Sequence, residues 1–95
     1  MTRPTKLPDS EIQAWLDKHP GWERVGDAIS KTFKKKDFAG AMAVAVKVGM
    51  AAEEKNHHPD IEIGWGRARV TWSTHDAGGI TSLDLEMAEA TDAAA

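Results

Sequence analysis

The spacing of hydrophobic residues switches between helical and extended patterns along the chain. The first pattern is helical, and its face carries Ile12, Trp15, Leu16 and His19. Ser10, with Gln13 three residues later, forms a capping-box pair that is expected to start this helix. Pro20-Gly21 is expected to end it, because both residues interrupt helical structure.

Two pairs of alternating segments predict two β-hairpins. Residues 22–25 and 28–36 flank a Gly26-Asp27 turn, and residues 60–65 and 68–74 flank a turn near Gly66. The side chains expected to share a face within their own strands are Ile29, Lys31 and Phe33, then Ile61, Ile63 and Trp65, then Ala68, Val70, Trp72 and Thr74.

The longest helical pattern follows Asp37, which is expected to cap it. Its broad stripe consists of Phe38, Ala41, Met42, Ala45, Val46, Val48, Gly49 and Ala52. Pro59 disfavours helical geometry at His58, so the helix should end near that residue. A last helix is expected after Thr81, which pairs with Asp84 in a capping box, and it should carry Ile80, Leu83 and Met87.

The predicted order α-β-β-α-β-β-α contains two hairpins and no sign of a βαβ crossover. We therefore expect an α+β fold, with a four-stranded antiparallel sheet and three helices packed on one face. The whole chain, residues 1–95, should form a single domain in which residues 1–6 and 91–95 are loose. One sheet face and two strand edges remain open, which favours homo-oligomerisation.

Composition excludes several classes of protein. The 95 residues carry a net charge of −3, which is unsuited to a dedicated nucleic-acid binder. Without cysteine the chain has neither disulfides nor a thiolate metal site. The most apolar run, residues 39–52, contains Lys47 and is too short to span a bilayer, and no signal-peptide pattern is present. These features predict a soluble, cytoplasmic protein without a membrane partner.

Three of the four histidines lie where predicted elements end. His57 and His58 follow the long helix and His75 ends the last strand, so the three can share a cleft suited to general acid–base catalysis. Zinc is disfavoured, because adjacent histidines rarely converge on one ion and no HExxH spacing occurs. His19, on the apolar side of the first helix, is expected to be structural.

The four tryptophans divide into two pairs. Trp15 and Trp72 fall on apolar faces and are expected in the core. Trp22 and Trp65 lie at strand ends, where each could either pack in the core or stack on a flat heterocycle.

The residues around the histidines resemble the pterin-4a-carbinolamine dehydratases. The similarity lies in the spacing Glu53-x3-His57-His58-Pro59-x5-Trp65-x9-His75-x8-Asp84, and upstream in Gly21-Trp22 and Lys36-Asp37-Phe38. This resemblance covers nearly the whole chain and agrees with the fold deduced above. It implies a hydro-lyase that dehydrates 4a-hydroxytetrahydropterin to quinonoid dihydropterin, the step that supports tetrahydrobiopterin recycling after an aromatic amino-acid hydroxylase has acted.

The same resemblance implies roles for individual residues. His57, His58 and His75 are the catalytic candidates, with His57 and His75 as acid and base and His58 binding or orienting the pterin. The further pterin-binding candidates are Glu53, which can hydrogen-bond an imidazole, Trp22, which would line the pocket, and Asp84, which is also a candidate helix cap.

No metal and no cofactor is implied, and the assembly implied is a homodimer or a dimer of dimers. The alternative to the enzyme is a non-catalytic dimerisation cofactor or assembly chaperone with the same fold. Relatives of that kind tend to lose the histidines, which this chain retains.

Overall fold

The computed structural model describes residues 5–95. In that range it contains three α-helices, four strands and one short 3-10 helix. Their bounds are α1 Asp9–Lys18, β1 Glu23–Val25, β2 Ala28–Lys34, α2 Phe38–Lys55, β3 Asp60–Gly64, β4 Arg67–Trp72, η1 His75–Ala77 and α3 Ser82–Ala94. The order of helices and strands is the one predicted from the sequence.

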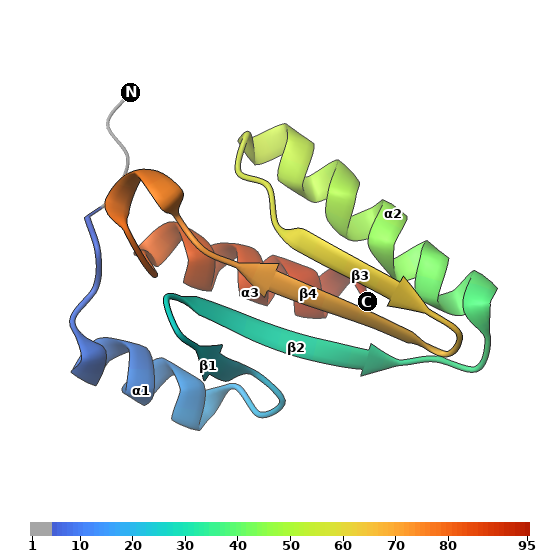
Figure 1. The fold of residues 1–95 in the computed structure, drawn as a ribbon, viewed down its shortest axis with the longest axis horizontal. Helices are drawn as coiled ribbons and strands as arrows, with labels where there is room; N and C mark the ends of the chain where they lie inside the picture. Colours follow the sequence, from blue (N-terminus) through green and yellow to red (C-terminus); the bar gives the residue numbers. More distant parts are fainter. Residues whose placement is uncertain (1–4) are drawn as a thin grey trace.

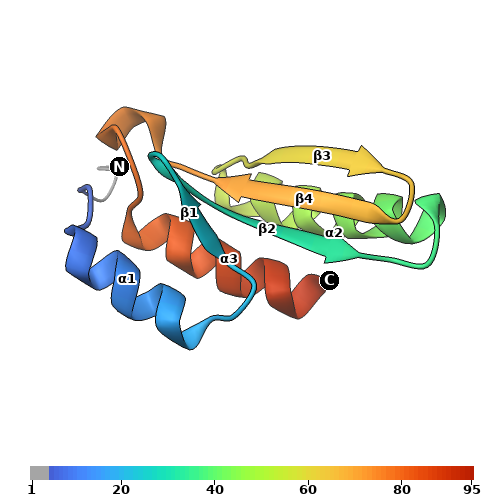
Figure 2. The same ribbon diagram turned by 60° about the horizontal axis from the view of Figure 1, so that its bottom comes forward.

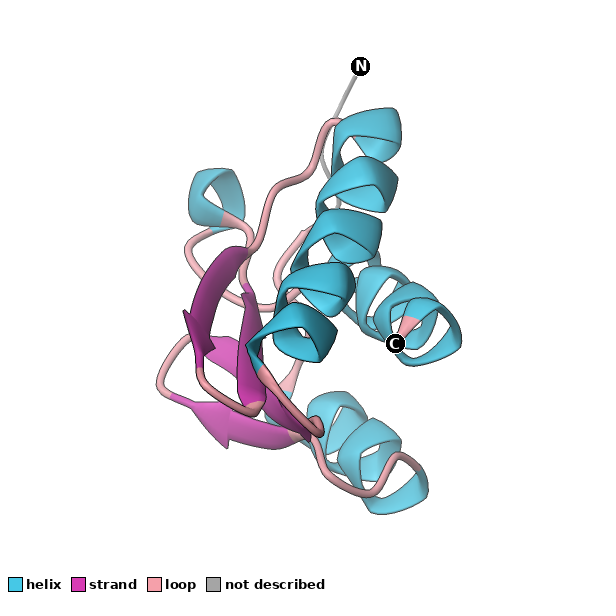
Figure 3. Ribbon diagram, turned by 90° about the vertical axis from the view of Figure 1, so that its right-hand side faces the viewer, coloured by secondary structure: helices cyan, strands magenta, loops and turns pink. Residues whose placement is uncertain are grey.

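The four strands form one antiparallel sheet in the order β1-β2-β4-β3, so β1 and β3 are its edges. The long hairpin β3–β4 lies beside β2, and α2 runs along the β3 side (Figure 1). Turned views show all three α-helices on the same side of the sheet (Figures 2 and 3). The predicted α+β architecture is confirmed.

The two faces of the sheet differ in polarity, as the alternating pattern requires. The helix-covered face supplies buried residues from the two central strands: Ile29, Ala68, Val70 and Trp72. On the opposite face the hydroxyl groups of Ser30 and Thr71 are hydrogen-bonded across the β2–β4 pair at 2.9 Å. Arg69 Nε donates to the Ser30 hydroxyl at 2.8 Å. This face therefore remains polar without covering helices.

The first helix begins one residue earlier than predicted. Asp9 is its first residue and Pro8 occupies the N-cap position, so Ser10 lies inside the helix and does not cap it. Proline fits the start of a helix because it has no N–H to satisfy. Arg24 donates to Asp9 Oδ1 at 2.8 Å, and this hydrogen bond, with the positive charge of Arg24, lowers the pKa of the Asp9 carboxyl.

Helix α2 buries a narrower stripe than the one predicted. Asp37 caps it as expected, with Oδ1 accepting from the backbone N–H of Gly40 at 2.8 Å. The buried residues are Ala41, Val44, Val48 and Ala52. Phe38, Met42, Val46 and Met50 are 46%, 41%, 57% and 70% exposed, and we call these four residues the α2 ridge. The predicted stripe was too wide, since only one side of the helix meets the sheet.

Helix α3 continues to Ala94, so residues 91–95 are not the loose tail expected from their composition. Thr91 is buried, and its hydroxyl accepts from the Trp72 indole N–H at 3.0 Å. The Asp92 carboxylate accepts from the Trp22 indole N–H at 3.0 Å and from Lys31 Nζ at 2.7 Å. These contacts tie the end of the helix to the sheet.

The other segment expected to be loose, residues 1–6, falls mainly on residues 1–4, which lie outside the described range. Just after it, the Leu7 N–H donates to the Ile80 carbonyl at 2.9 Å.

Within residues 5–95, no helix combines the length and apolar composition that crossing a membrane requires.

We expect Asp92→Ala to lower the free energy of unfolding by about 1–3 kcal/mol, because it leaves a partly buried indole N–H and ammonium without their acceptor. Urea or thermal unfolding measures the change. Asp17→Ala is the matched control and should change stability little, because it removes an exposed carboxylate whose side-chain hydrogen bond within residues 5–95 is to Gln13. Equal effects of the two substitutions would contradict the anchoring of α3.

The α2 ridge supports self-association, which we propose for this chain because contiguous exposed apolar residues mark contact surfaces. Light scattering at micromolar concentration should return a mass above the 10.3 kDa of one chain. Val46→Lys should weaken association about tenfold or more, the effect of about 1.4 kcal/mol. Ala14→Lys puts the same charge on the exposed surface of α1 and should leave association unchanged. A monomeric wild type would contradict the proposal.

Candidate active site

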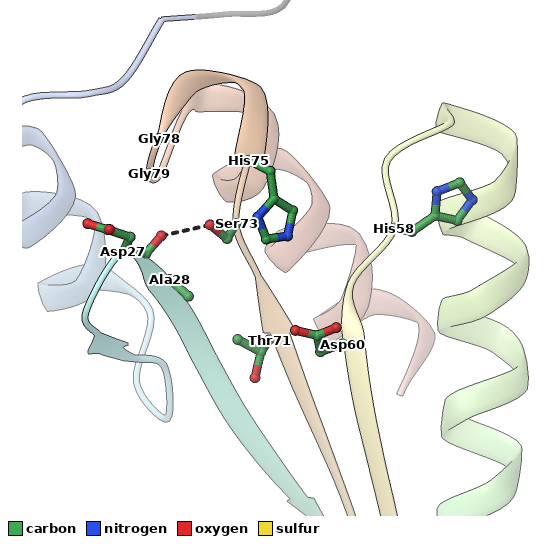
Figure 4. Close-up of a pocket in the computed structure, with 9 residues that line it drawn as sticks. All are labelled: Asp27, Ala28, His58, Asp60, Thr71, Ser73, His75, Gly78 and Gly79. Atoms are coloured by element: carbon green, nitrogen blue, oxygen red, sulfur yellow. Dashed lines mark hydrogen bonds between the residues drawn. The ribbon is translucent and has the colours of Figure 1, made fainter.

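Two adjoining cavities open at the end of the sheet where β4 ends and β2 and β3 begin. The larger, about 330 Å³, is lined by Asp27, Ala28, His58, Asp60, Thr71, Ser73, His75, Gly78 and Gly79 (Figure 4). The smaller, about 230 Å³, is lined by Asn56, His57, His58, Ser73, Thr74, His75 and Asp76. His58, Ser73 and His75 line both cavities, so the three predicted histidines do share one concave region.

The side chains of His57 and His58, which follow the end of α2, point in different directions. Asn56 adopts the left-handed conformation, with φ of 50°, and ends the helix. The His57 N–H then bonds back to the Ala52 carbonyl at 3.2 Å. Because successive side chains of an extended segment point to opposite sides, His57 turns inward and is only 6% exposed, whereas His58 stays exposed.

A short closed loop holds His75 just beyond β4. The Thr74 N–H donates to the Gly79 carbonyl at 3.0 Å, and the Gly79 N–H donates back to the Thr74 carbonyl at 3.3 Å. Gly78, with φ of 76°, makes the turn between them. His75 is exposed, and its side chain makes no hydrogen bond or ion pair with any described residue. Its imidazole is therefore available to a ligand.

His57 is held by a buried carboxylate. Its Nε2 lies 2.6 Å from Asp84 Oδ1, and Asp84 is fully buried. Asp84 Oδ2 accepts from the Thr81 N–H at 2.9 Å, the predicted helix-capping bond, and from the Thr74 hydroxyl at 2.7 Å. The His57 ring also stacks on Trp72, with centroids 5.6 Å apart and planes 20° apart. The ring is thus fixed both by its edge and by its face.

His58 has a looser partner. Its Nε2 lies 3.2 Å from Glu53 Oε2, and both side chains are more than half exposed. The carboxylate–imidazole contact expected of Glu53 is therefore made with His58. Figure 4 shows the His58 ring turned toward α2, while the His75 ring lies above Thr71 and Asp60. A water-exposed pair of this kind is weak and can rearrange when a ligand arrives.

The structure does not bring Trp22 or Asp84 to the cavity walls. Trp22 is 5% exposed, bonds Asp92 through its indole N–H, and meets Phe33 edge to face at 6.4 Å, which makes it a core residue. Asp84 reaches the smaller cavity through its hydrogen bonds to His57 and Thr74, which line that cavity. Trp65 is 76% exposed in the β3–β4 turn, at the opposite end of β4 from His75.

The remaining wall of the larger cavity is polar and was missed from the sequence. Thr71, Ser73 and His75 follow one another at alternate positions on the polar face of β4 and just beyond its end. Asp60, two residues after His58, begins the neighbouring edge strand. The Ser73 hydroxyl donates to the Asp27 carbonyl at 2.9 Å. The alternation of polar residues that leads to His75 was the available signal.

Two other sequence expectations concern the first helix. His19 is structural as expected, because its ring stacks on Trp15 at 3.9 Å and its Nδ1 lies 2.7 Å from the Trp15 carbonyl oxygen. Trp15 itself is only partly buried at the edge of the core, and Trp72 is fully buried within it. Among residues 5–95, no three histidine or carboxylate side chains are grouped so that they could hold a metal ion.

Comparison with known proteins identifies the family. The sequence profile described as pterin 4 alpha carbinolamine dehydratase matches residues 5–94. The chain belongs to the pterin 4 alpha carbinolamine dehydratase family. Two curated relatives, whose names assign them to this dehydratase provisionally, are of similar length. One from Thermosynechococcus vestitus is 43% identical over 88% of each chain, and one from Thermomicrobium roseum is 46% identical over 87% of this chain and 89% of its own.

Solved structures agree with the assignment to the dehydratase family. A Brucella melitensis protein described as a transcriptional coactivator/pterin dehydratase has a TM-score of 0.90 and 35% identity over 96% of this chain and 99% of its own. A pterin dehydratase-like protein described as a RuBisCO assembly factor of the alpha-carboxysome has a TM-score of 0.63 and 22% identity over 79% of this chain and 89% of its own. The second likeness concerns the fold alone.

The burial of His57 predicts a larger effect on folding for this residue than for the exposed His75. His57→Ala leaves the buried Asp84 carboxylate without a partner on Oδ1, so we expect a loss of about 3–5 kcal/mol in the free energy of unfolding. His75→Ala should cost about 0.5 kcal/mol or less, as an exposed substitution does. Chemical denaturation compares the two, and His57→Gln should recover part of the loss, because its amide N–H can donate to Asp84. Equal stabilities of all three variants would contradict this assignment.

Proposed function

We propose that the chain is a hydro-lyase that converts 4a-hydroxytetrahydropterin into quinonoid dihydropterin and water. The observation that carries this proposal is that His58 and His75 line the larger cavity while all three histidines line the smaller one, in a chain of the dehydratase family. Small-molecule sites usually occupy about 300–1,000 Å³. The larger cavity, at about 330 Å³, suits a compact bicyclic heterocycle.

The reaction requires two proton transfers and no change of oxidation state. The lone pair of the adjacent ring nitrogen forms a carbon–nitrogen double bond as the bond from C4a to the hydroxyl oxygen breaks. An acid delivers a proton to the departing oxygen, which leaves as water, and a base takes a proton from the ring nitrogen. Imidazole performs both kinds of transfer near neutral pH, which is why a histidine set suits this elimination.

The surroundings of each imidazole suit it to a different part of this chemistry. His75 is exposed and makes no side-chain hydrogen bond within residues 5–95, so it can turn toward the ligand. His57 is fixed by Asp84 and Trp72, which suits it to proton exchange at a constant position. His58, loosely paired with Glu53, suits binding and orientation. The hydroxyl groups of Thr71 and Ser73 offer hydrogen bonds to the polar edges of a pterin.

The finer part of the proposal is the physiological setting. A 4a-hydroxytetrahydropterin arises when an aromatic amino-acid hydroxylase oxidises its tetrahydropterin, so we expect this chain to act after such an enzyme and to support tetrahydrobiopterin recycling. A binding or assembly role, as described for the more distant structural relative, is the second candidate. The complete histidine set favours the enzyme, because an exposed imidazole such as His75 has no part in holding the fold together.

Stopped-flow absorbance with chemically generated carbinolamine tests the proposal by following quinonoid formation. His75→Ala should lower the rate about 10²- to 10⁴-fold, the usual contribution of a positioned acid or base. The matched control is His19→Gln, which alters a histidine that lines neither cavity and should leave the rate near that of the wild type. Both variants are compared after their folding has been checked by circular dichroism.

Two outcomes would contradict the proposal in different ways. Full activity of His75→Ala would show that the cavity described here is the wrong site. A folded wild type that is inactive on every carbinolamine tested would reject the hydro-lyase and favour the binding role.

A further inference from the structure

The wall of the larger cavity contains a carboxylate that the proposed acid–base chemistry does not use. Asp60 is the first residue of β3, two residues after His58, and lies directly opposite Thr71 in the β3–β4 register. Figure 4 shows its carboxylate beside Thr71 and below the His75 ring. The Asp60 side chain is exposed and makes no hydrogen bond or ion pair with any residue in the range 5–95. Its two oxygens can therefore accept hydrogen bonds from a ligand.

No positive side chain of residues 5–95 offsets this charge inside the cavity. Within that range, no lysine or arginine lines either cavity. Arg69 lies on the same face of the sheet, but its Nε donates to Ser30 on β2, which is on the other side of β4 from β3. The second carboxylate of the lining, that of Asp27, turns away from Asp60 (Figure 4). The wall around Asp60 thus favours a ligand edge that carries N–H donors and disfavours an anionic one.

The pyrimidine ring of a pterin has such an edge. Its C2 amine and the adjacent N3–H are neighbouring donors, and the two oxygens of one carboxylate can accept from both. Hydrogen bonds to an ionised acceptor are stronger than those between neutral groups. C2 and C4a are opposite members of the same six-membered ring, so a contact at C2 leaves the hydroxyl on C4a for the imidazoles.

We infer that Asp60 selects the 2-amino-4-oxo ring of a pterin by accepting hydrogen bonds from its C2 amine and N3–H. The choice of ligand rests on the proposed function, and the inference adds the edge of the ligand that is recognised and the residue that recognises it. A pteridine with an oxygen at C2 would place an acceptor against the Asp60 carboxylate. Two acceptors repel each other, so the site should discriminate at this one atom of the ligand.

The test compares pterin with lumazine, the analogue that has a carbonyl oxygen in place of the C2 amine. Fluorescence titration, which follows the emission of the ligand itself, measures both affinities at about pH 7, where an ordinary aspartate is ionised. The wild type should bind pterin at least about tenfold more tightly, because a site built to accept a hydrogen bond rejects the analogue that cannot donate it. Asp60→Asn should weaken pterin binding about 10- to 100-fold. The ratio of the two affinities should then fall close to one, because the new amide N–H can donate to the C2 oxygen.

Glu62→Gln is the matched control. Glu62 is the next residue of β3 on the same face, is exposed like Asp60, and lines neither cavity. The substitution removes the same charge from the same strand and should leave both affinities unchanged. In the dehydration assay, Asp60→Asn should raise KM about 10- to 100-fold with kcat nearly unchanged, which is the signature of an interaction made equally with substrate and transition state.

A wild type that binds pterin no more tightly than lumazine would overturn the inference, as would a folded Asp60→Asn variant that keeps the wild-type preference. An equal loss of pterin affinity in Glu62→Gln would also overturn it, because the effect would then belong to net charge. If the wild type prefers pterin through Asp60 but dehydrates no carbinolamine, the proposed reaction fails while the recognition is supported. An active wild type whose preference does not depend on Asp60 supports the reaction and rejects the inference.

Discussion

The buried Asp84 carboxylate joins the end of α2, the end of β4 and the start of α3. It caps the start of α3 through Thr81, receives the Thr74 hydroxyl from the end of β4, and holds His57 beyond the end of α2. The donors to a buried carboxylate can move very little. Each hydrogen bond that is lost leaves the desolvation of the carboxylate uncompensated, which destabilises the fold. The three segments therefore meet in one arrangement, and the cavities form where they meet. The position of His57 depends on this interior carboxylate.

The alternating segments made the sheet predictable. Strands with one buried and one polar face have a period of two, and the turns at Gly26 and Gly66 have positive φ, which explains why glycine marks them. The long helix was less predictable, because apolar residues occupy more of its circumference than the sheet can cover. Sequence periodicity finds the apolar side of a helix but does not say which part of that side meets a partner within the same chain.

The candidate site was predictable in its histidines and not in the support around them. His57, His58 and His75 were found because they lie where elements end, and chain order alone suggested that these ends meet. The difference between His57 and His58 depends on the left-handed turn at Asn56, which directs one ring inward and the other outward. The alanine-rich segment after Ala90 resembled a frayed end, yet Thr91 and Asp92 accept hydrogen bonds from two tryptophans and a lysine of other elements.

The unequal burial of the histidines affects how related sequences should be interpreted. A chain of this fold that no longer needed catalysis could lose an exposed imidazole like that of His75 by drift, because the substitution would leave the packing of the interior unchanged. The imidazole of His57 would be retained longer, because its loss leaves a buried charge unpaired. Retention of a histidine at position 57 is therefore weak grounds for inferring catalysis in a relative. The residue at position 75 is the more informative one, because selection on folding alone would not preserve a histidine there.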